Sequence, residues 1–158
     1  MKTINISAIL VILVFGATAL TAQERETPPV TLDKVGEHVY QILGGSGSNG
    51  GLIIGENAVL VIDAKMNEES VIQTIEAIKE LTDKPIKYLV NTHSDGDHIM
   101  GNRWFPGSLT FIAHENCRDD FFKENFGRAS DWGEPEFYPF TPSMTFKMNM
   151  DIWLGKDK

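Results

Sequence analysis

The amino-acid sequence predicts an α/β domain, in which helices pack on a layer of strands. Several short runs of β-branched and aliphatic residues are typical of strands buried in a sheet. A longer segment among them repeats its apolar side chains at helical spacing. With 158 residues, the chain has the length of one modest domain. Strands are expected at 38–43, 51–55, 58–63, 86–90 and 109–113, and helices at 67–82 and 115–126.

The first strands differ in composition. HVYQIL at 38–43 is rich in β-branched and aromatic residues, and AVLVID at 58–63 is continuously apolar, as in a strand buried on both faces. GLIIG at 51–55 is expected to pair with its neighbours as a hairpin ladder that turns through Glu56 and Asn57.

The segment 67–82 is predicted to be a helix. Asn67 is expected to cap its N-terminus, and Asp83 to Pro85 are expected to end it. Its apolar stripe is expected to consist of Val71, Ile72, Ile75, Ile78 and Leu81.

The C-terminal third contains a predicted long loop at 127–143, rich in Gly, Pro and aromatic residues. Apolar and polar residues then alternate from 146 to 154, which predicts a half-buried strand. Residues 155–158 have the composition of a turn, so a returning strand is expected beyond them.

The first 22 residues have the pattern of a secretory signal peptide, with Lys2 before an uncharged apolar stretch and small residues after it. The alternative is a membrane anchor, but the strongly apolar core is shorter than the ~20 residues that span a bilayer. Residues 1–22 are therefore expected to be a signal peptide and 23–35 a linker. The mature protein is expected to be periplasmic or secreted, with no membrane attachment.

Charge and cysteine content narrow the function further. The net charge of −8 argues against nucleic acid as a partner, because phosphate binding needs a basic face. It fits a small-molecule ligand. The single cysteine, Cys117, has no internal disulfide partner and is interpreted as a small buried residue.

A glycine-rich stretch at 45–50 matches the dinucleotide-binding pattern G-x-G-x-x-G, with Asp63 placed 18 residues after Gly45. That fold requires the last glycine to open a crossover helix. The next residues are β-branched and lead directly into another strand, so no crossover helix fits. The stretch is interpreted as a flexible hairpin tip that could border an active site.

The stretch NTHSDGDHIMGN at 91–102 carries the strongest functional signal. His93, Asp95, Asp97 and His98 fall within six residues, directly after a buried strand, where α/β folds place their ligands. Imidazole and carboxylate groups are suitable ligands for a divalent metal. The alternative is a polar loop in which Asp97 caps a short helix near His98 and Asp95 lies in a turn. Metal binding is the favoured interpretation.

This stretch resembles the signature of the metallo-β-lactamase superfamily, T-H-x-H-x-D-H followed shortly by G-N. The resemblance covers roughly 36–158, which is taken as the domain, and it implies the N-terminal half of an αββα sandwich. The stretch GLIIGENAVLVIDAKM at 51–66 resembles the family's opening hairpin, whose strand ends at the position of Asp63. LTFIAHEN at 109–116 resembles the strand that follows the motif. The matching residues are Thr92, His93, Asp97, His98, Gly101 and Asn102.

The resemblance implies roles for the matched residues. His93 would bind a first metal, and Asp97 and His98 a second, with Asp97 also orienting the metal-bound hydroxide as a catalytic residue. Asp95 stands where the family has a histidine. It can still ligate, but a more negative site could favour Mn²⁺ or Fe²⁺ over the two Zn²⁺ ions otherwise expected. Asp63 would hold the motif loop from outside the ligand set, or be a strand-end turn residue.

The other candidates are interpreted as structural, namely His38, His114 and Cys117 as non-ligands and Trp104 and Phe105 as core. No histidine follows His114, so the remaining family ligands are missing and the domain is expected to be truncated at its C-terminus. The favoured function is metal-dependent hydrolysis of a β-lactam, lactone, thioester or related small molecule. A non-catalytic metal-binding or interaction fragment and a metal-free protein of the same fold remain open, as does self-association through an uncovered sheet face.

Overall fold

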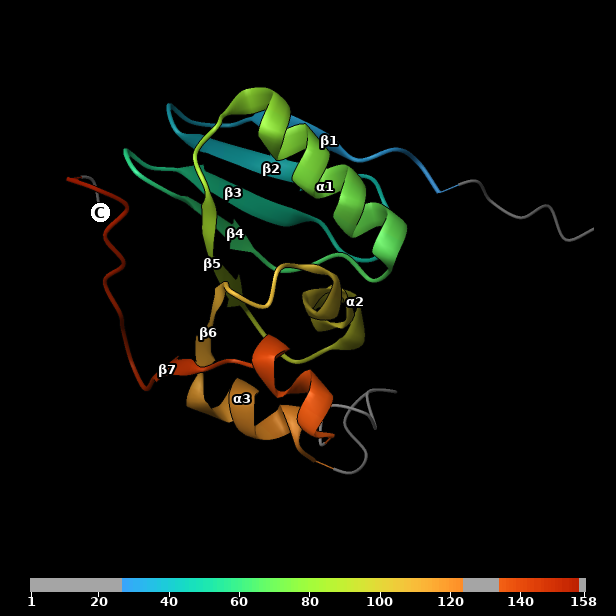
Figure 1. Cartoon of the computed structure of the whole chain (residues 1–158), viewed down its shortest axis with the longest axis vertical. Helices are drawn as coiled ribbons and strands as arrows, with labels where there is room; N and C mark the ends of the chain where they lie inside the picture. The colour runs from blue at the N-terminus through green and yellow to red at the C-terminus, as the bar shows by residue number, and fades with distance from the viewer. Residues whose placement is uncertain (1–26, 124–133, 157–158) are drawn as a thin grey trace, which may run out of the picture.

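The computed structural model describes residues 27–123 and 134–156 (Figure 1). The predicted signal peptide lies outside the described residues. Within those two ranges, no helix combines the length and the apolar character needed to cross a membrane.

A single mixed sheet organises the chain. Its seven strands follow one another in sequence order, antiparallel from β1 to β4 and parallel from β4 to β7. The antiparallel ladder through Glu56 and Asn57 confirms the predicted hairpin, and it excludes a crossover helix after the glycine-rich stretch. The strands are β1 Thr31–Lys34, β2 Val39–Leu43, β3 Gly50–Ile54, β4 Val59–Ile62, β5 Ile86–Asn91, β6 Thr110–His114 and β7 Met144–Phe146.

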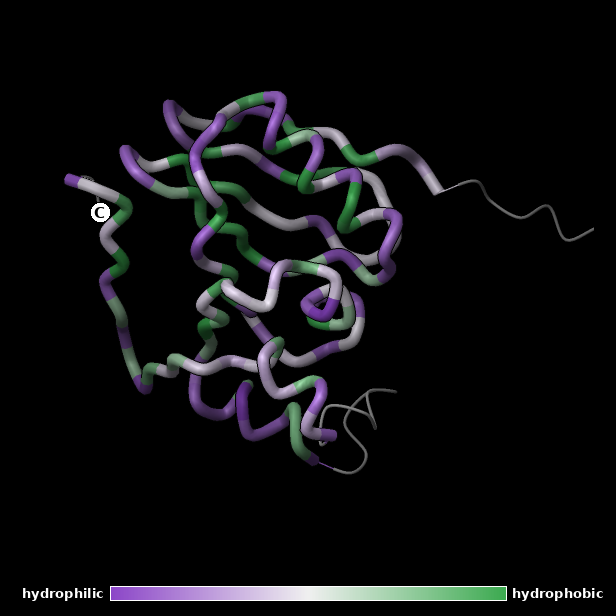
Figure 2. The backbone as a smooth tube through the Cα atoms, viewed as in Figure 1, coloured by the Kyte–Doolittle hydropathy of each residue, from purple (hydrophilic) through white to green (hydrophobic). Residues whose placement is uncertain are grey.

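The longest described helix, α1 (Glu68–Leu81), crosses from β4 to β5 and covers one face of the sheet (Figure 1). Asn67 caps it as predicted, since its side chain accepts a 3.0 Å hydrogen bond from the Ser70 amide. The main core lies between α1 and the sheet, where the side chains of Val59, Val61 and Leu89 are fully buried. Figure 2 shows the hydrophobic residues following the central strands.

The predicted apolar stripe of α1 is only partly correct. Val71 and Ile78 are buried, whereas Ile72 and Leu81 are 45% and 44% exposed. The buried face instead includes Ser70 and Thr74, whose polar groups are satisfied locally because the Thr74 hydroxyl donates to Ser70 O. Hydroxyls that find partners can therefore replace aliphatic side chains on the inner face.

Strand β1 lies inside the range that was expected to be a linker. Thr31–Lys34 pairs antiparallel with β2 along its whole length, although three of its four residues are exposed. An exposed edge strand is held by its backbone ladder rather than by burial. Polar composition therefore does not reveal it.

The strand predicted at 146–154 is wrong. Strand β7 ends at Phe146, and residues 147–156 form no strand but run back along the edge of the domain to the β3–β4 turn (Figure 1). There Leu154 is buried against Gly55, and its carbonyl accepts a 2.9 Å hydrogen bond from the Asn57 amide. Met148 is 91% exposed, so the alternation does not mark a sheet face.

Shorter helices follow β5, beginning with α2 (Gly96–Ile99), η1 (Met100–Trp104) and α3 (Glu115–Phe121). Helix α3 ends earlier than predicted, and residues 124–126 of its predicted range lie outside the described residues. A 3-10 helix, η3 (Pro135–Phe140), occupies part of the predicted loop at 127–143. Phe105 is buried in the main core and Trp104 packs against it, as expected.

The other sheet face carries a smaller cluster. Ala58, Leu60 and Leu154 are buried there, with Ile53, Ile62, Tyr88, Val90 and Ile152 partly buried around them. The members of this cluster that belong to β3, β4 and β5 alternate along each strand with the residues that face α1. Among the described residues, the C-terminal segment is what packs on this cluster.

Candidate metal centre

The motif lies at the carboxyl ends of the parallel strands. Strand β5 ends at Asn91, and Thr92 to Asp95 lead into α2. The N-cap of α2 is Asp95, and its side chain makes no capping hydrogen bond. The alternative in which Asp97 caps this helix is therefore wrong, because Asp97 lies within its first turn.

Asp63 fixes the motif loop from the end of β4. Its carboxylate accepts hydrogen bonds from the Thr92 amide (2.8 Å), the Thr92 hydroxyl (2.7 Å) and Nδ1 of His98 (2.9 Å). Asp63 is 7% exposed and has a φ of 60°, a left-handed conformation that non-glycine residues seldom adopt. Of the two roles considered for Asp63, the geometry fits the one in which it holds the motif loop.

The bond to Asp63 sets the state of the His98 ring. Because Nδ1 faces a carboxylate, Nδ1 carries the hydrogen, and the lone pair of a neutral ring is then on Nε2. Nε2 lies 3.6 Å from Oδ2 of Asp97. This is the arrangement in which a carboxylate orients a metal-binding histidine from behind.

His93 and Asp95 form a second pair. Nδ1 of His93 lies 3.5 Å from Oδ2 of Asp95, and the Asp95 amide donates to the same nitrogen. The rings of His93 and His98 are in contact, with centroids 3.9 Å apart. The four residues therefore form a continuous chain of neighbours. Their side chains are 47% (His93), 67% (Asp95), 44% (Asp97) and 16% (His98) exposed.

The described residues supply pairs of donors rather than complete sites. No group of three or more His, Cys, Asp or Glu side chains within 27–123 and 134–156 is arranged to hold one metal ion. Catalytic zinc normally has three protein ligands. Among the described residues, neither pair of motif side chains is therefore joined by a third candidate ligand.

The glycine-rich loop between β2 and β3 closes over Asp97. The Ser48 hydroxyl donates to the Asp97 carboxylate, and the Ser48 amide donates to the Asp97 carbonyl (3.3 Å). The hydrogen bond from Ser48 is the main reason that the pKa of Asp97 lies below its ordinary value. A serine in a glycine-rich hairpin gives no sequence signal for this contact, so Ser48 was not predicted.

The last two residues of the motif support the loop from below. Asn102 is fully buried and pairs its side-chain amide with that of Asn91 at 2.8 and 3.2 Å. The Asn91 amide also donates to the carbonyl of His98. A side chain at Gly101 would overlap the carbonyl of Lys65, because its Cβ would lie 2.0 Å from that oxygen.

Comparison with known proteins identifies this arrangement. A sequence model of the metallo-beta-lactamase superfamily matches residues 43–152. The chain belongs to this superfamily. The match includes the hairpin, the helix α1 and the whole motif.

Solved metallo-β-lactamases share the fold. The enzyme FIM-1 from Pseudomonas aeruginosa in its mono-zinc form is 18% identical, with a TM-score of 0.59 over 79% of this chain and 54% of that one. DIM-1 is 19% identical, with a TM-score of 0.59 over 78% and 54%. A metallo-β-lactamase from Erythrobacter litoralis is 21% identical, with a TM-score of 0.52 over 58% and 44%. The chain thus spans about half the length of these structures.

The other candidate ligands of this metallo-β-lactamase-type domain have structural roles. His114 precedes α3, where Nδ1 accepts from the Asn116 amide (3.1 Å) and Nε2 therefore donates to Lys147 O (2.7 Å). Cys117 is buried, and burial raises the pKa of its thiol to about 12. His38 is exposed beside Glu37. Among the described residues, none of the three joins the motif in a group of three or more candidate metal ligands.

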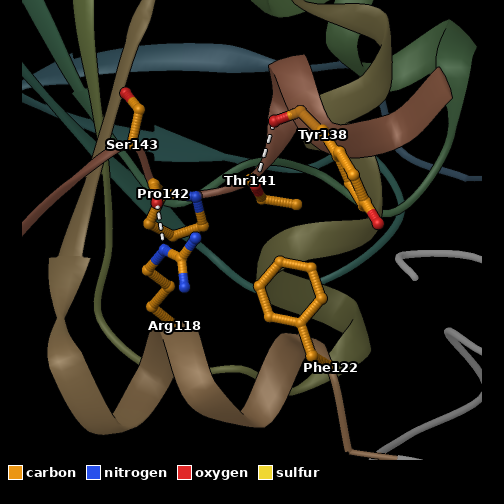
Figure 3. A pocket seen from close by; sticks show the side chains of 6 residues that line it. All are labelled: Arg118, Phe122, Tyr138, Thr141, Pro142 and Ser143. Carbon is orange, nitrogen blue, oxygen red and sulfur yellow. Dashed lines mark hydrogen bonds between the residues drawn. The ribbon is translucent and has the colours of Figure 1, made fainter. Parts of the chain in front are cut away.

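Two cavities flank α3. A polar one of about 290 Å³ opens beside the motif, and its lining consists of Thr92, His93, Ser94, His114, Asn116, Cys117 and Asp120. Another, of about 430 Å³, lies between α3 and η3 (Figure 3). There Nε of Arg118 donates to Pro142 O (2.9 Å), and Phe122 and Tyr138 meet edge to face. No motif residue lines this second cavity.

Proposed function

We propose that this chain carries part of the metal centre of a metal-dependent hydrolase that acts on a carbonyl or ester-type bond of a small molecule. One observation carries the proposal most directly. Asp63 holds Nδ1 of His98, so that Nε2 is directed toward the carboxylate of Asp97. A ring held in this way has lost the freedom that ligand binding would otherwise have to remove.

The donor spacing fits a divalent ion. Two ligands on a tetrahedral zinc ion lie about 3.4 Å apart when each bond is ~2.0–2.2 Å long. The separation of 3.6 Å between Nε2 of His98 and Oδ2 of Asp97 is close to this value. Nδ1 of His93 lies 3.5 Å from Oδ2 of Asp95, but it accepts the Asp95 amide and would have to give up that bond to hold an ion. His98 and Asp97 would hold one ion, and His93 and Asp95 a neighbouring one.

The metals would supply Lewis acidity and make water a competent nucleophile at neutral pH. Asp97 would act as the catalytic residue of the motif, because a carboxylate that stays ionised can orient an attacking water by accepting its hydrogen bond. Its pKa lies below the ordinary aspartate value, which is itself well below neutrality, so Asp97 is ionised throughout the neutral range. His98 and Asp63 would keep the site in place.

Zinc is the metal proposed first, since imidazole and carboxylate ligands suit it. Asp95 is a harder ligand than the histidine expected at this position, and it adds negative charge. Competition between Zn²⁺ and Mn²⁺ for the chain and for Asp95→His tests its effect. The histidine variant is expected to shift preference toward Zn²⁺.

Localisation and assembly complete the proposal. Export to the periplasm or outside would follow from the signal-peptide pattern at 1–22. The partly covered cluster around Leu60 on the second sheet face would support self-association. Sedimentation over a concentration series measures it, and a single monomeric species at all concentrations would contradict it.

Metal affinity and hydrolytic activity, measured together, distinguish a hydrolase from a protein that only binds metal. With two donors per centre, the chain is expected to bind Zn²⁺ or Mn²⁺ with a dissociation constant above about 1 μM and to turn over little substrate. Activity lost in Asp97→Ala, in whichever length of the protein is active, would support the hydrolase. Metal binding without activity in any form would support the non-catalytic alternative.

A further inference from the structure

Lys65 is a buried cation that the proposed reaction does not use. It follows β4 by three residues, is 3% exposed, and burial lowers the pKa of its ammonium. A buried amine needs a hydrogen-bond acceptor, and Nζ finds one in the carbonyl of Ser48 at 2.8 Å. The chain thus places a buried lysine behind the loop that covers the motif.

The same loop is held at several other points. The Met66 amide donates to Ser46 O (2.9 Å), and the Ser46 amide donates to the hydroxyl of Ser70 (2.8 Å). Gly47 has a φ of 98°, and a Cβ there would lie 2.8 Å from Asp97 O and 2.9 Å from the Met66 nitrogen. The loop therefore fits closely between the Lys65–Met66 backbone and the motif, and it is not a free hairpin tip.

We infer that Lys65 is a positioning residue for Asp97, acting through the glycine-rich loop. Its ammonium holds the Ser48 carbonyl on one side, and this orients Ser48 to donate its hydroxyl to the Asp97 carboxylate on the other. Lys65 touches no motif side chain in the described contacts, so its effect on the site passes through Ser48. The inference rests on the proposed function in that Asp97 is taken as a metal ligand.

The chain offers a matched control. Lys84 also donates from Nζ to a backbone carbonyl, Gly55 O at 2.7 Å, at the other end of the sheet from the motif. Lys65→Met and Lys84→Met therefore remove the same charge and the same kind of bond, with Lys65 buried and Lys84 exposed. Methionine has similar length and no polar group to leave unpaired in the buried position, so Lys65→Met is expected to fold. Lys65→Gln is a second variant that retains a donor.

Hydrogen exchange tests the loop without any metal. In Lys65→Met, the amides of Ser48 and Met66 are expected to exchange at least ~10-fold faster, while those of Val61 and Leu89 in the core stay unchanged. Lys84→Met should leave all four rates unchanged. Unchanged exchange of Ser48 and Met66 in both Lys65 variants would overturn the inference.

Titration with Co²⁺, followed by its visible absorption, tests the effect on the site. Lys65→Met and Ser48→Ala are each expected to weaken binding about 10-fold, as loss of an outer hydrogen bond to a ligand typically does. Ser48→Thr, which keeps the hydroxyl, and Lys84→Met are expected to stay within about twofold.

Combining the substitutions separates positioning from general destabilisation. If Lys65 acts through Ser48, the double variant that combines Lys65→Met with Ser48→Ala binds Co²⁺ no more weakly than Ser48→Ala alone. The inference would be overturned if the double variant lost Co²⁺ affinity by the product of the two single losses. Wild-type Co²⁺ affinity in Lys65→Met would also overturn it. If the wild-type chain binds no Co²⁺, the proposed function fails instead, and the exchange rates alone decide whether Lys65 holds the loop.

Discussion

The two halves of the motif differ in how firmly the fold holds them. His98 is 16% exposed and bonded to Asp63, and its neighbour Asp97 is bonded to Ser48. His93 and Asp95 are 47% and 67% exposed, and the contacts described for their side chains are within the motif. The same six-residue stretch thus contains a supported pair and an unsupported one.

The difference follows from the strands that meet at the motif. Asp63, at the end of β4, contacts His98 and Thr92, and Ser48 of the β2–β3 loop contacts Asp97. Neither residue hydrogen-bonds to the side chain of His93 or Asp95 in the described contacts. The other side opens onto the polar cavity next to α3. The described fold therefore pre-organises one pair of donors and leaves the other dependent on further contacts.

The largest effect is expected on the free energy of unfolding when Asp63 is substituted. Asp63→Ala removes three hydrogen bonds to one carboxylate and leaves the Thr92 and His98 donors unpaired, so the free energy of unfolding is expected to fall by about 3 kcal/mol. Asp95→Ala, on the exposed side, should change it by less than about 0.5 kcal/mol. Urea unfolding of both variants measures the contrast, and equal losses would break the comparison.

Metal affinity should show the same asymmetry. His98→Ala removes a pre-oriented ligand and is expected to weaken Zn²⁺ binding more than 10-fold. His93→Ala removes an exposed ligand with no outer carboxylate behind it and should cost only about threefold. Competition titration with a chromophoric chelator compares them, and a larger loss in His93→Ala would reverse the assignment.

The pKa of Asp97 gives a smaller, sharper test. Because the Ser48 hydroxyl stabilises the carboxylate, Ser48→Ala should raise the pKa of Asp97 toward its ordinary value. The stabilisation from this bond is present above the ordinary pKa and is lost as pH falls through the lower pKa of the folded state. Carbon-13 NMR titration of the side-chain carboxyl detects the shift. No change in Ser48→Ala would show that the hydroxyl does not stabilise the ionised form.

The smallest effect is expected for added Zn²⁺ on the reactivity of the Cys117 thiol. With a thiol pKa of about 12, almost no thiolate forms at pH 8. The native chain is therefore expected to react with a disulfide reagent far more slowly than the same chain in urea, and added Zn²⁺ should not change the native rate. Protection by Zn²⁺ would add a thiolate to the ligand set.

Much of the fold is predictable from local pattern. The buried strands, the cap at Asn67 and the order of elements follow from composition and period, because burial constrains those residues on both sides. Two segments are mispredicted because burial does not constrain most of their side chains. Thr31–Lys34 is a strand despite its exposed side chains, and 147–154 alternates in polarity without forming a strand.

The candidate site is predictable in its ligand types but not in its supports. Histidine and aspartate at close spacing are visible in the sequence, and the resemblance to the superfamily implied that Asp63 holds the motif loop. Ser48 and Lys65 were missed, since serine in a glycine-rich turn and a lysine after a strand are common surface patterns. A lysine within three residues of the end of a continuously apolar strand is the one sequence signal that could have drawn attention to Lys65.

The most direct test of the account is a titration of the chain with Zn²⁺, with and without the Asp97→Ala and His98→Ala substitutions, alongside a hydrolysis assay. We predict a dissociation constant above about 1 μM, little turnover, and a further loss of affinity in either variant. Sub-micromolar binding with turnover would contradict the two-donor geometry. Binding that neither substitution alters would contradict the assignment of the metal to this motif.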